Sequence, residues 1–223
     1  MKIHNKCTAI LIDSMGDDMR VANAARVSFD KWKDEFDASD EGLINYLARH
    51  KHWTPFGHVM LTMRLYMPMF VARQWIKSDV GCIRNDNGVE NEVSRRYVDS
   101  DPEFYIPDEF HKRPDGGIKQ GCGAVHPANE SIKDGAYATC SNAFHVYKNR
   151  LQIGIAPEEA RIFLPQNTMT TIVETGSLAY YARVCKLRLD SHAQSATRQL
   201  AQEVADLAAH IAPISWVALM SDV

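Results

Sequence analysis

The chain has 223 residues and a formal net charge of -3 at pH 7. This length suits one domain spanning residues 1–223, and the near-neutral charge gives no electrostatic case for binding nucleic acid. No apolar run approaches the length of a membrane span, and the first apolar run is too short for a signal peptide. Five cysteines without a CxxC pair indicate reduced thiols in a cytoplasmic protein, encoded by a cell or by a virus.

The apolar pattern predicts short strands mixed with amphipathic helices. Residues 8–12 suit a first strand, and Asp17 or Asp18 can cap the helix that follows. A strand is expected over 59–67, where every second residue is apolar, and Pro68 ends it. Further expected elements are helices over 41–50 and 70–77, an extended segment over 101–107, a long helix through 137–151, a helix from 157, a strand over 168–173, and helices over 178–187 and 196–207.

Residues 52–58 contain two histidines around a Thr-Pro pair. No carboxylate or cysteine nearby completes a zinc ligand set, so we expect no metal site there. A turn ordered by Pro55 and leading into the next strand is the better interpretation.

Residues 70–97 carry a dense set of polar side chains. On the expected helix, Arg73 or Gln74 can project beside Lys77, because residues three or four apart share a face. Alternation over 91–97 predicts a strand with Glu92, Ser94 and Arg96 on one face. An acid, a hydroxyl and a guanidinium in one row can bind a polar ring or a phosphate. On composition alone, however, an arginine-rich strand is more often a solvated edge.

Four segments carry distinctive motifs in this order along the chain: His52-Trp53-Thr54-Pro55-Phe56-Gly57-His58, then Arg73-Gln74 with Asn91-Glu92-Val93-Ser94-Arg95-Arg96-Tyr97, then Ala160-Arg161-Ile162-Phe163-Leu164-Pro165, and Leu187-Arg188-Leu189-Asp190-Ser191-His192-Ala193-Gln194. Together they resemble the motifs of the flavin-dependent thymidylate synthases. Three departures indicate a diverged, phage-like member. The family's Arg-His-Arg core is replaced by Lys77-Ser78-Asp79, Gly57 stands where the family usually has Glu, and the connection before Ser94 is seven residues longer.

The resemblance implies an α/β (α+β) fold, an antiparallel sheet flanked by long helices, in a homotetramer whose subunits share active sites. It implies transfer of a one-carbon unit from methylenetetrahydrofolate to C5 of deoxyuridine monophosphate (dUMP). FAD would carry hydride from NADPH, giving thymidylate (dTMP).

The resemblance also assigns residues. For dUMP it implies Gln74, Glu92, Ser94, Arg96, Arg161 and Arg188. For FAD it implies Thr54, Lys77, Ser78, Asp79, Glu92 and His192, with Arg183 replacing a lost contact. We expect Arg188 to act catalytically on the ring, because a guanidinium stays cationic and forks onto two acceptors. Arg96, Arg161 and the Ser94 hydroxyl would hold the phosphate, so Ser94 is expected to bind and not to act as a nucleophile.

The altered core leaves other functions open. Ser78 removes an imidazole and Asp79 reverses a charge near an anionic cofactor, which should weaken flavin binding unless Arg84 in the longer connection compensates. Residues 80–90 are expected to form a loop or small hairpin at the mouth of the site, and the sequence leaves open whether this segment is a lid or a solvated insertion. The alternatives are a hydroxymethylating pyrimidine-nucleotide enzyme on the same scaffold, or a nucleotide-binding protein that has lost FAD.

Overall fold

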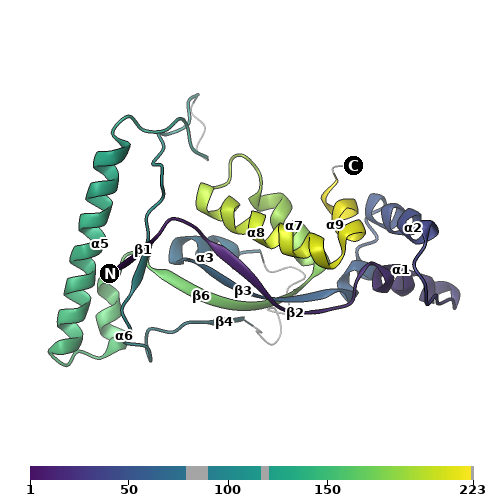
Figure 1. Cartoon of the computed structure of the whole chain (residues 1–223), viewed down its shortest axis with the longest axis horizontal. Coiled ribbons are helices and arrows are strands. Elements are labelled where there is room, and N and C mark those ends of the chain that lie inside the picture. Colours follow the sequence, from purple (N-terminus) through teal and green to yellow (C-terminus); the bar gives the residue numbers. More distant parts are fainter. Residues whose placement is uncertain (79–89, 117–120, 222–223) are drawn as a thin grey trace.

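The computed structural model describes residues 1–78, 90–116 and 121–221, whose arrangement is shown in Figure 1. The strands are β1 (Lys2–His4), β2 (Thr8–Met15), β3 (Met60–Pro68), β4 (Glu90–Glu92), β5 (Glu103–Tyr105) and β6 (Met169–Ser177). The helices are α1 (Asp18–Arg26), α2 (Ala38–Arg49), α3 (Met69–Trp75), α5 (Asn129–Gln152), α6 (Pro157–Ala160), α7 (Leu178–Arg188), α8 (Ser195–Ile211) and α9 (Pro213–Met220), with 3-10 turns η1 (Val27–Phe29), η2 (Thr54–His58) and η3 (Arg161–Phe163). Within the described ranges, no helix combines the length and apolar composition needed to cross a membrane.

The centre of the fold is an antiparallel sheet with strand order β2-β3-β6-β4. The longest ladder joins β3 to β6, from Met60 opposite Ser177 to Pro68 opposite Met169. The alternation in β3 turns Leu61, Met63 and Leu65 into the core, where each is completely buried. Helices α3, α7 and α8 cover that face (Figure 1), so the predicted class of an antiparallel sheet flanked by helices is confirmed.

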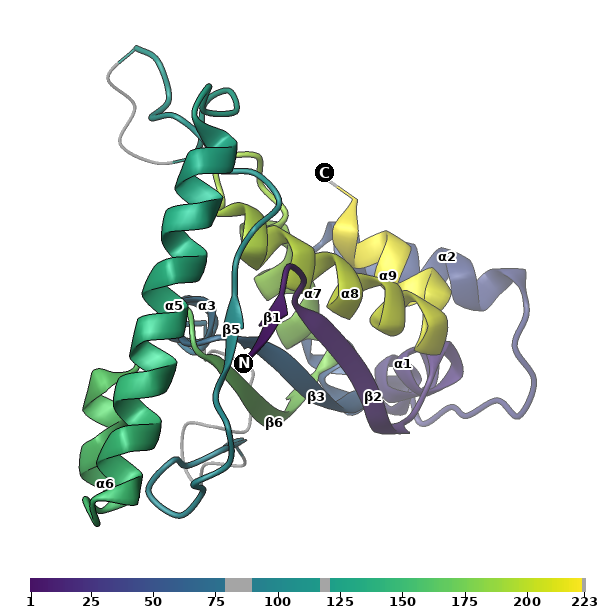
Figure 2. The same ribbon diagram turned by 60° about the vertical axis from the view of Figure 1, so that its left-hand side comes forward.

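A second, smaller core lies at one end of the molecule. Strands β1 and β5 pair in parallel, and Phe104 and Ile106 pack there against Cys140 of α5. Figure 2 shows α5 standing beside β1 and β5, apart from the helices over the main sheet. Gly154 follows α5 with a positive φ of 89°, as expected of a glycine that ends a helix.

Most of the predicted elements are present, with shifted boundaries. Asp17 caps α1, since its side chain accepts from the Arg20 N–H. Helix α3 ends at Trp75, so Lys77 lies beyond the helix and not on its face. Strand β1 and helix α9 were not predicted, because both are short and carry no distinct periodic pattern. Residues 79–89, including Asp79 and Arg84, lie outside the described structure, so the predictions for the connection stand as predictions.

The predicted strand over 91–97 is wrong in its second half. Strand β4 ends at Glu92, and the last bond to β6 runs from the Val93 N–H to the Thr171 carbonyl (3.0 Å). A turn follows, closed by the Tyr97 N–H on the Ser94 carbonyl (3.1 Å). The Ser94 hydroxyl accepts from the Arg96 N–H (3.4 Å), a local side-chain bond of the kind that favours a turn over continued strand pairing.

Buried charges join α1 to the start of α2. Asp40 is completely buried, forms an ion pair with Arg26, and accepts from Lys33 Nζ (3.0 Å) and the Asp37 N–H (2.7 Å). Burial alone would raise the pKa of the Asp40 carboxyl, but the Asp37 N–H, Lys33 and Arg26 together hold that pKa below its ordinary value. The carboxylate therefore stabilises the folded state wherever it is ionised.

We expect Asp40→Asn to lower the midpoint of thermal unfolding by several degrees at pH 7, because two cations lose their buried partner. Since the pKa of Asp40 is lower in the folded state, its stabilisation is complete above the ordinary carboxyl pKa of about 4 and is lost as the pH falls through the folded value. The variant should therefore lose less stability than the parent between neutral and acidic pH. Thermal melts across that range test this, and parallel curves would contradict it.

Candidate active site

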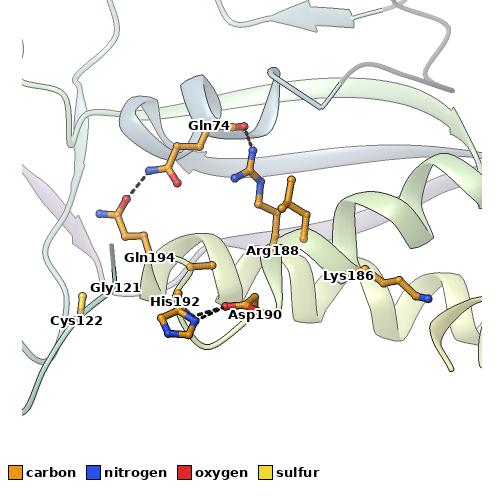
Figure 3. Close-up of a pocket in the computed structure, with 10 residues that line it drawn as sticks. Gln74, Gly121, Cys122, Lys186, Arg188, Asp190, His192 and Gln194 are labelled. Carbon is orange, nitrogen blue, oxygen red and sulfur yellow. Dashed lines mark hydrogen bonds and ion pairs between the residues drawn. The ribbon is translucent and has the colours of Figure 1, made fainter. Parts of the chain in front are cut away.

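The first cavity of interest, the Arg188 cavity, has a volume of about 790 Å³ and lies where α3 and α7 end. Its lining residues are Gln74, Gly121, Cys122, Lys186, Leu187, Arg188, Asp190, His192, Ala193 and Gln194. Figure 3 shows Gln74 from α3 between the side chains of Arg188 and Gln194. Three of the predicted site residues, Gln74, Arg188 and His192, therefore share one cavity.

Arg188 is the last residue of α7, and its guanidinium is fixed from α3. Its Nη2 donates to the Gln74 carbonyl oxygen (2.6 Å) and to the Ser78 hydroxyl (3.3 Å). Burial lowers the pKa of the Arg188 guanidinium, but an arginine starts so far above neutrality that the group stays cationic. The site therefore holds a partly desolvated positive charge, which acts more strongly on a ligand than an exposed one.

The Gln74 side chain is engaged inside the chain. Its Nε2 donates to Gln194 Oε1 (2.5 Å), and its Oε1 accepts from the Thr197 hydroxyl (3.2 Å) on α8. The predicted role of Gln74 as a dUMP ligand remains a prediction. The structure adds a contact that the sequence did not indicate, namely that its backbone carbonyl holds Arg188.

His192 is oriented by its neighbour Asp190. One carboxylate oxygen of Asp190 accepts from the His192 N–H (2.7 Å) and lies 2.9 Å from His192 Nδ1. These two bonds lower the pKa of the Asp190 carboxyl, which keeps it an acceptor. Nδ1 therefore carries the proton, and Nε2 is the nitrogen that a neutral His192 offers as an acceptor.

A second cavity, the Arg96 cavity, has a volume of about 620 Å³. Its lining residues are Met69, Arg73, Glu92, Val93, Ser94, Arg95, Arg96, Arg161, Ile162, Leu164, Gln166, Thr168, Met169 and Thr170. The predicted row of Glu92, Ser94 and Arg96 thus stays together despite the turn, and Arg161 from η3 joins it. The pattern of one acid among several cations suits a phosphate.

Three arginines of this cavity are anchored in the same way. Arg73 Nε donates to Gln166 Oε1 (3.1 Å), Arg96 Nε donates to Ser94 Oγ (3.2 Å), and Arg161 Nε donates to the Glu158 carbonyl (3.2 Å). Each bond fixes the guanidinium at Nε. Its two terminal nitrogens have no hydrogen-bond or ion-pair partner in the described ranges and can bind an anion. The one carboxylate among the described residues that line this cavity, Glu92, is held in turn by the Thr170 hydroxyl (2.8 Å).

Sequence reasoning missed Arg73 and its anchor Gln166, as well as Thr170. The helical spacing pointed to Arg73 and Lys77 as neighbours, but α3 ends before Lys77. Because Arg73 and Gln74 are adjacent on a short helix, they point to different sides of it. Arg73 lines the Arg96 cavity and Gln74 lines the Arg188 cavity, so α3 stands between the two. In one chain, Arg96 and Arg161 converge while Arg188 lies across α3 from them.

The residues predicted to bind FAD are spread more widely. Thr54 lines a third cavity of about 800 Å³, the Thr54 cavity, whose walls include Phe29, Tyr46 and Trp53. His192 and Glu92 line the other two cavities, and Ser78 is buried against Arg188. The linings of these three cavities include neither Lys77 nor Arg183 among the described residues. No group of three or more His, Cys, Asp or Glu in the described ranges could hold a metal ion.

Comparison with known proteins shows which family this chain belongs to. The family model described as "Thymidylate synthase complementing protein" matches residues 10–214. A flavin-dependent thymidylate synthase of Thermosipho africanus is 35% identical over 98% of this chain and 93% of its own length. The chain belongs to the flavin-dependent thymidylate synthase family.

Further relatives agree with this membership. A flavin-dependent thymidylate synthase of Thermus thermophilus is 33% identical over 93% of this chain and 73% of its own length. A crystal structure of the UMP/dUMP methylase PolB from Streptomyces cacaoi, bound with 5-Br dUMP, matches with a TM-score of 0.84 and 27% identity. That match covers 98% of this chain and 96% of the other. The family predicted from the motifs is therefore confirmed.

The anchored arginines predict that this family member binds inorganic phosphate in the Arg96 cavity. Arg73→Ala should weaken phosphate binding about tenfold, because it removes one charge-assisted contact. Titration calorimetry with phosphate measures the change. Arg49→Ala, which removes the same charge from an exposed site on α2, is the matched control. Equal weakening by both variants would show an effect of net charge and not of the cavity.

Proposed function

We propose that the chain transfers a one-carbon unit from methylenetetrahydrofolate to C5 of dUMP, with hydride passing from NADPH through FAD, and so makes dTMP in the cytoplasm. The observation that carries the proposal is the set of three anchored guanidinium groups, Arg73, Arg96 and Arg161, one short helix away from the partly buried Arg188. The thymidylate synthase activity for which the relatives are named and the 5-Br dUMP bound to PolB support a pyrimidine nucleotide as the substrate.

The phosphate of dUMP would lie in the Arg96 cavity. A phosphate monoester offers three oxygens, and each anchored arginine presents terminal N–H groups that fork onto such oxygens. The Ser94 hydroxyl already accepts from Arg96 and can turn its own proton toward the phosphate. Because the cavity is open to solvent, these cations gain most of their strength only once water is excluded.

Arg188 would act on the base. Uracil C5 is a poor nucleophile, and negative charge develops on the O4/N3 edge when the ring is activated for attack through C5. A fixed guanidinium against that edge stabilises this charge without reorganising during the reaction. The Gln74 carbonyl and the Ser78 hydroxyl hold Arg188 in place, and burial keeps its charge poorly screened. Asp190 holds His192 at Nδ1 in the same cavity, which leaves Nε2 to face a ligand.

The described residues fit a flavin. The aromatic and apolar walls of the Thr54 cavity suit a planar ring, and His192 and Glu92 can hydrogen-bond to polar edges. We propose that Lys77, Asp79 and Arg183 bind the cofactor with these residues. The predicted flavin contact of Ser78 is not part of this proposal, because its hydroxyl accepts from Arg188. When bound, the reduced flavin supplies the hydride that completes the methyl group. The chain's own residues hold the nucleotide, polarise the ring and exclude water.

We further propose a homotetramer in which copies share active sites. The phosphate cations and Arg188 line separate cavities in one chain, and the predicted flavin residues divide among three cavities. A neighbouring copy can bring its Arg188 cavity to face an Arg96 cavity and so complete both. Apolar side chains exposed on β2 support such an interface, since Ile10 is 57% and Ile12 is 53% exposed.

The purified protein should show a flavin absorbance spectrum that NADPH bleaches. It should convert dUMP and methylenetetrahydrofolate to a product in which one ring hydrogen is replaced by a methyl group. Absorbance and mass analysis of the product check both points. A hydroxymethyl group in the product would favour the hydroxymethylating alternative. Binding of dUMP without flavin or turnover would favour a nucleotide-binding protein.

Arg188→Ala should lower kcat by about a hundredfold to a thousandfold, because it removes the group that stabilises charge on the ring. Binding of inorganic phosphate should be unchanged, since Arg188 does not line the Arg96 cavity. Steady-state kinetics and phosphate titration give the two readouts, with Arg49→Ala as the control. Near-normal turnover would remove Arg188 from the mechanism.

A further inference from the structure

The guanidinium of Arg188 is held through a single nitrogen. Nη2 contacts both the Gln74 carbonyl and the Ser78 hydroxyl, whereas Nε is buried without a hydrogen-bond partner in the part of the chain that the structure describes. Two acceptors on one nitrogen define the orientation of the planar guanidinium better than a single acceptor does. If the Ser78 contact were lost, the guanidinium could rotate about its remaining bond to Gln74.

Ser78 is itself fixed to the core. Its side chain is 3% exposed, and its N–H donates to the Trp75 carbonyl (3.0 Å) at the end of α3. The Trp75 indole donates to Glu174 Oε1 (3.1 Å) on β6, and both of these side chains are completely buried. The last turn of α3 is therefore tied to the sheet, and the Ser78 hydroxyl has a defined position relative to it.

The residue type at position 78 suits a contact with the Arg188 guanidinium. A hydroxyl oxygen can accept from a cation, whereas a positively charged side chain would repel the guanidinium at this distance. Ser78 stands in the Lys77-Ser78-Asp79 segment, which departs from the Arg-His-Arg core that the resemblance led us to expect. The described structure turns this side chain toward Arg188 and not into any of the three cavities.

We infer that Ser78 is a positioning residue for Arg188, which orients the guanidinium toward the base of the nucleotide. This inference rests on the proposed function. It gives the altered segment a role in reading the pyrimidine ring that does not depend on contact with the flavin. The role is distinct from support of the fold, because it acts on the base and not on the phosphate.

Two ligands distinguish a positioning role of Ser78 from a role in supporting the fold alone. The nucleotide dUMP carries both the base and the phosphate, whereas deoxyribose 5-phosphate carries only the part that the Arg96 cavity would hold. Ser78→Ala should weaken dUMP binding about tenfold and leave the binding of deoxyribose 5-phosphate unchanged. Ser78→Thr, which keeps the hydroxyl, should bind dUMP within about threefold of the parent.

Ser215→Ala is the matched control. Ser215 is also completely buried, and its hydroxyl has no hydrogen-bond partner in the described structure. This control should change neither affinity. The Ser78→Ala effect on dUMP should also disappear in an Arg188→Ala background, because the serine would have no guanidinium to orient.

Failure of the inference about Ser78 and failure of the proposed function give different results. Equal weakening of both ligands by Ser78→Ala, or a Ser78→Thr variant that binds dUMP as weakly as Ser78→Ala, would overturn the inference. An unchanged loss in the Arg188→Ala background would overturn it too. If the parent protein neither binds nor converts dUMP, the proposed function itself fails, and that result is visible before any variant is made.

Discussion

The hydrogen bond from Arg188 to the backbone of Gln74 joins the ends of two helices, and the rest of the site depends on it. It exists because β3 and β6 are antiparallel neighbours. Helix α3 starts directly after β3 at one end of this ladder, and α7 starts directly after β6 at the other end. Both helices turn back over the same face of the sheet, so their C-terminal ends meet and bring Gln74 to Arg188 (Figure 1).

The positive charge of Arg188, where α3 and α7 end, determines which ligands this part of the site favours. Burial disfavours the charged form of Arg188, so this cation favours a ligand that brings negative charge. Across α3, Arg73, Arg96 and Arg161 are each fixed at Nε by a neutral acceptor and not by a carboxylate. Neutral anchors orient the guanidinium groups without neutralising them. The charge of these side chains therefore remains available for a bound anion.

The short helix α3 also explains why the predicted site residues of one chain line separate cavities. Its successive residues Arg73 and Gln74 face different cavities, which places the cations suited to a phosphate on one side and the cation suited to a base on the other. The sharing of sites between copies that we propose would resolve this separation. Divergence in the Lys77-Ser78-Asp79 segment then affects the side that holds Arg188, while the arginines of the Arg96 cavity keep their anchors.

The sequence by itself determined the family and most of the elements, and it named the candidate site residues. Strict alternation identified β3, and ordered motifs identified the family, since both signals are local along the chain. It failed where local and tertiary preferences compete: a turn that starts at Ser94 follows the early end of β4, and the end of α3 separates Lys77 from Arg73. Only the tertiary structure decided that Arg73 joins Arg161, and that Gln74 and Ser78 hold Arg188. These pairs of residues are about 90 to 115 positions apart, and strand pairing and helix packing bring them together, which no local pattern encodes.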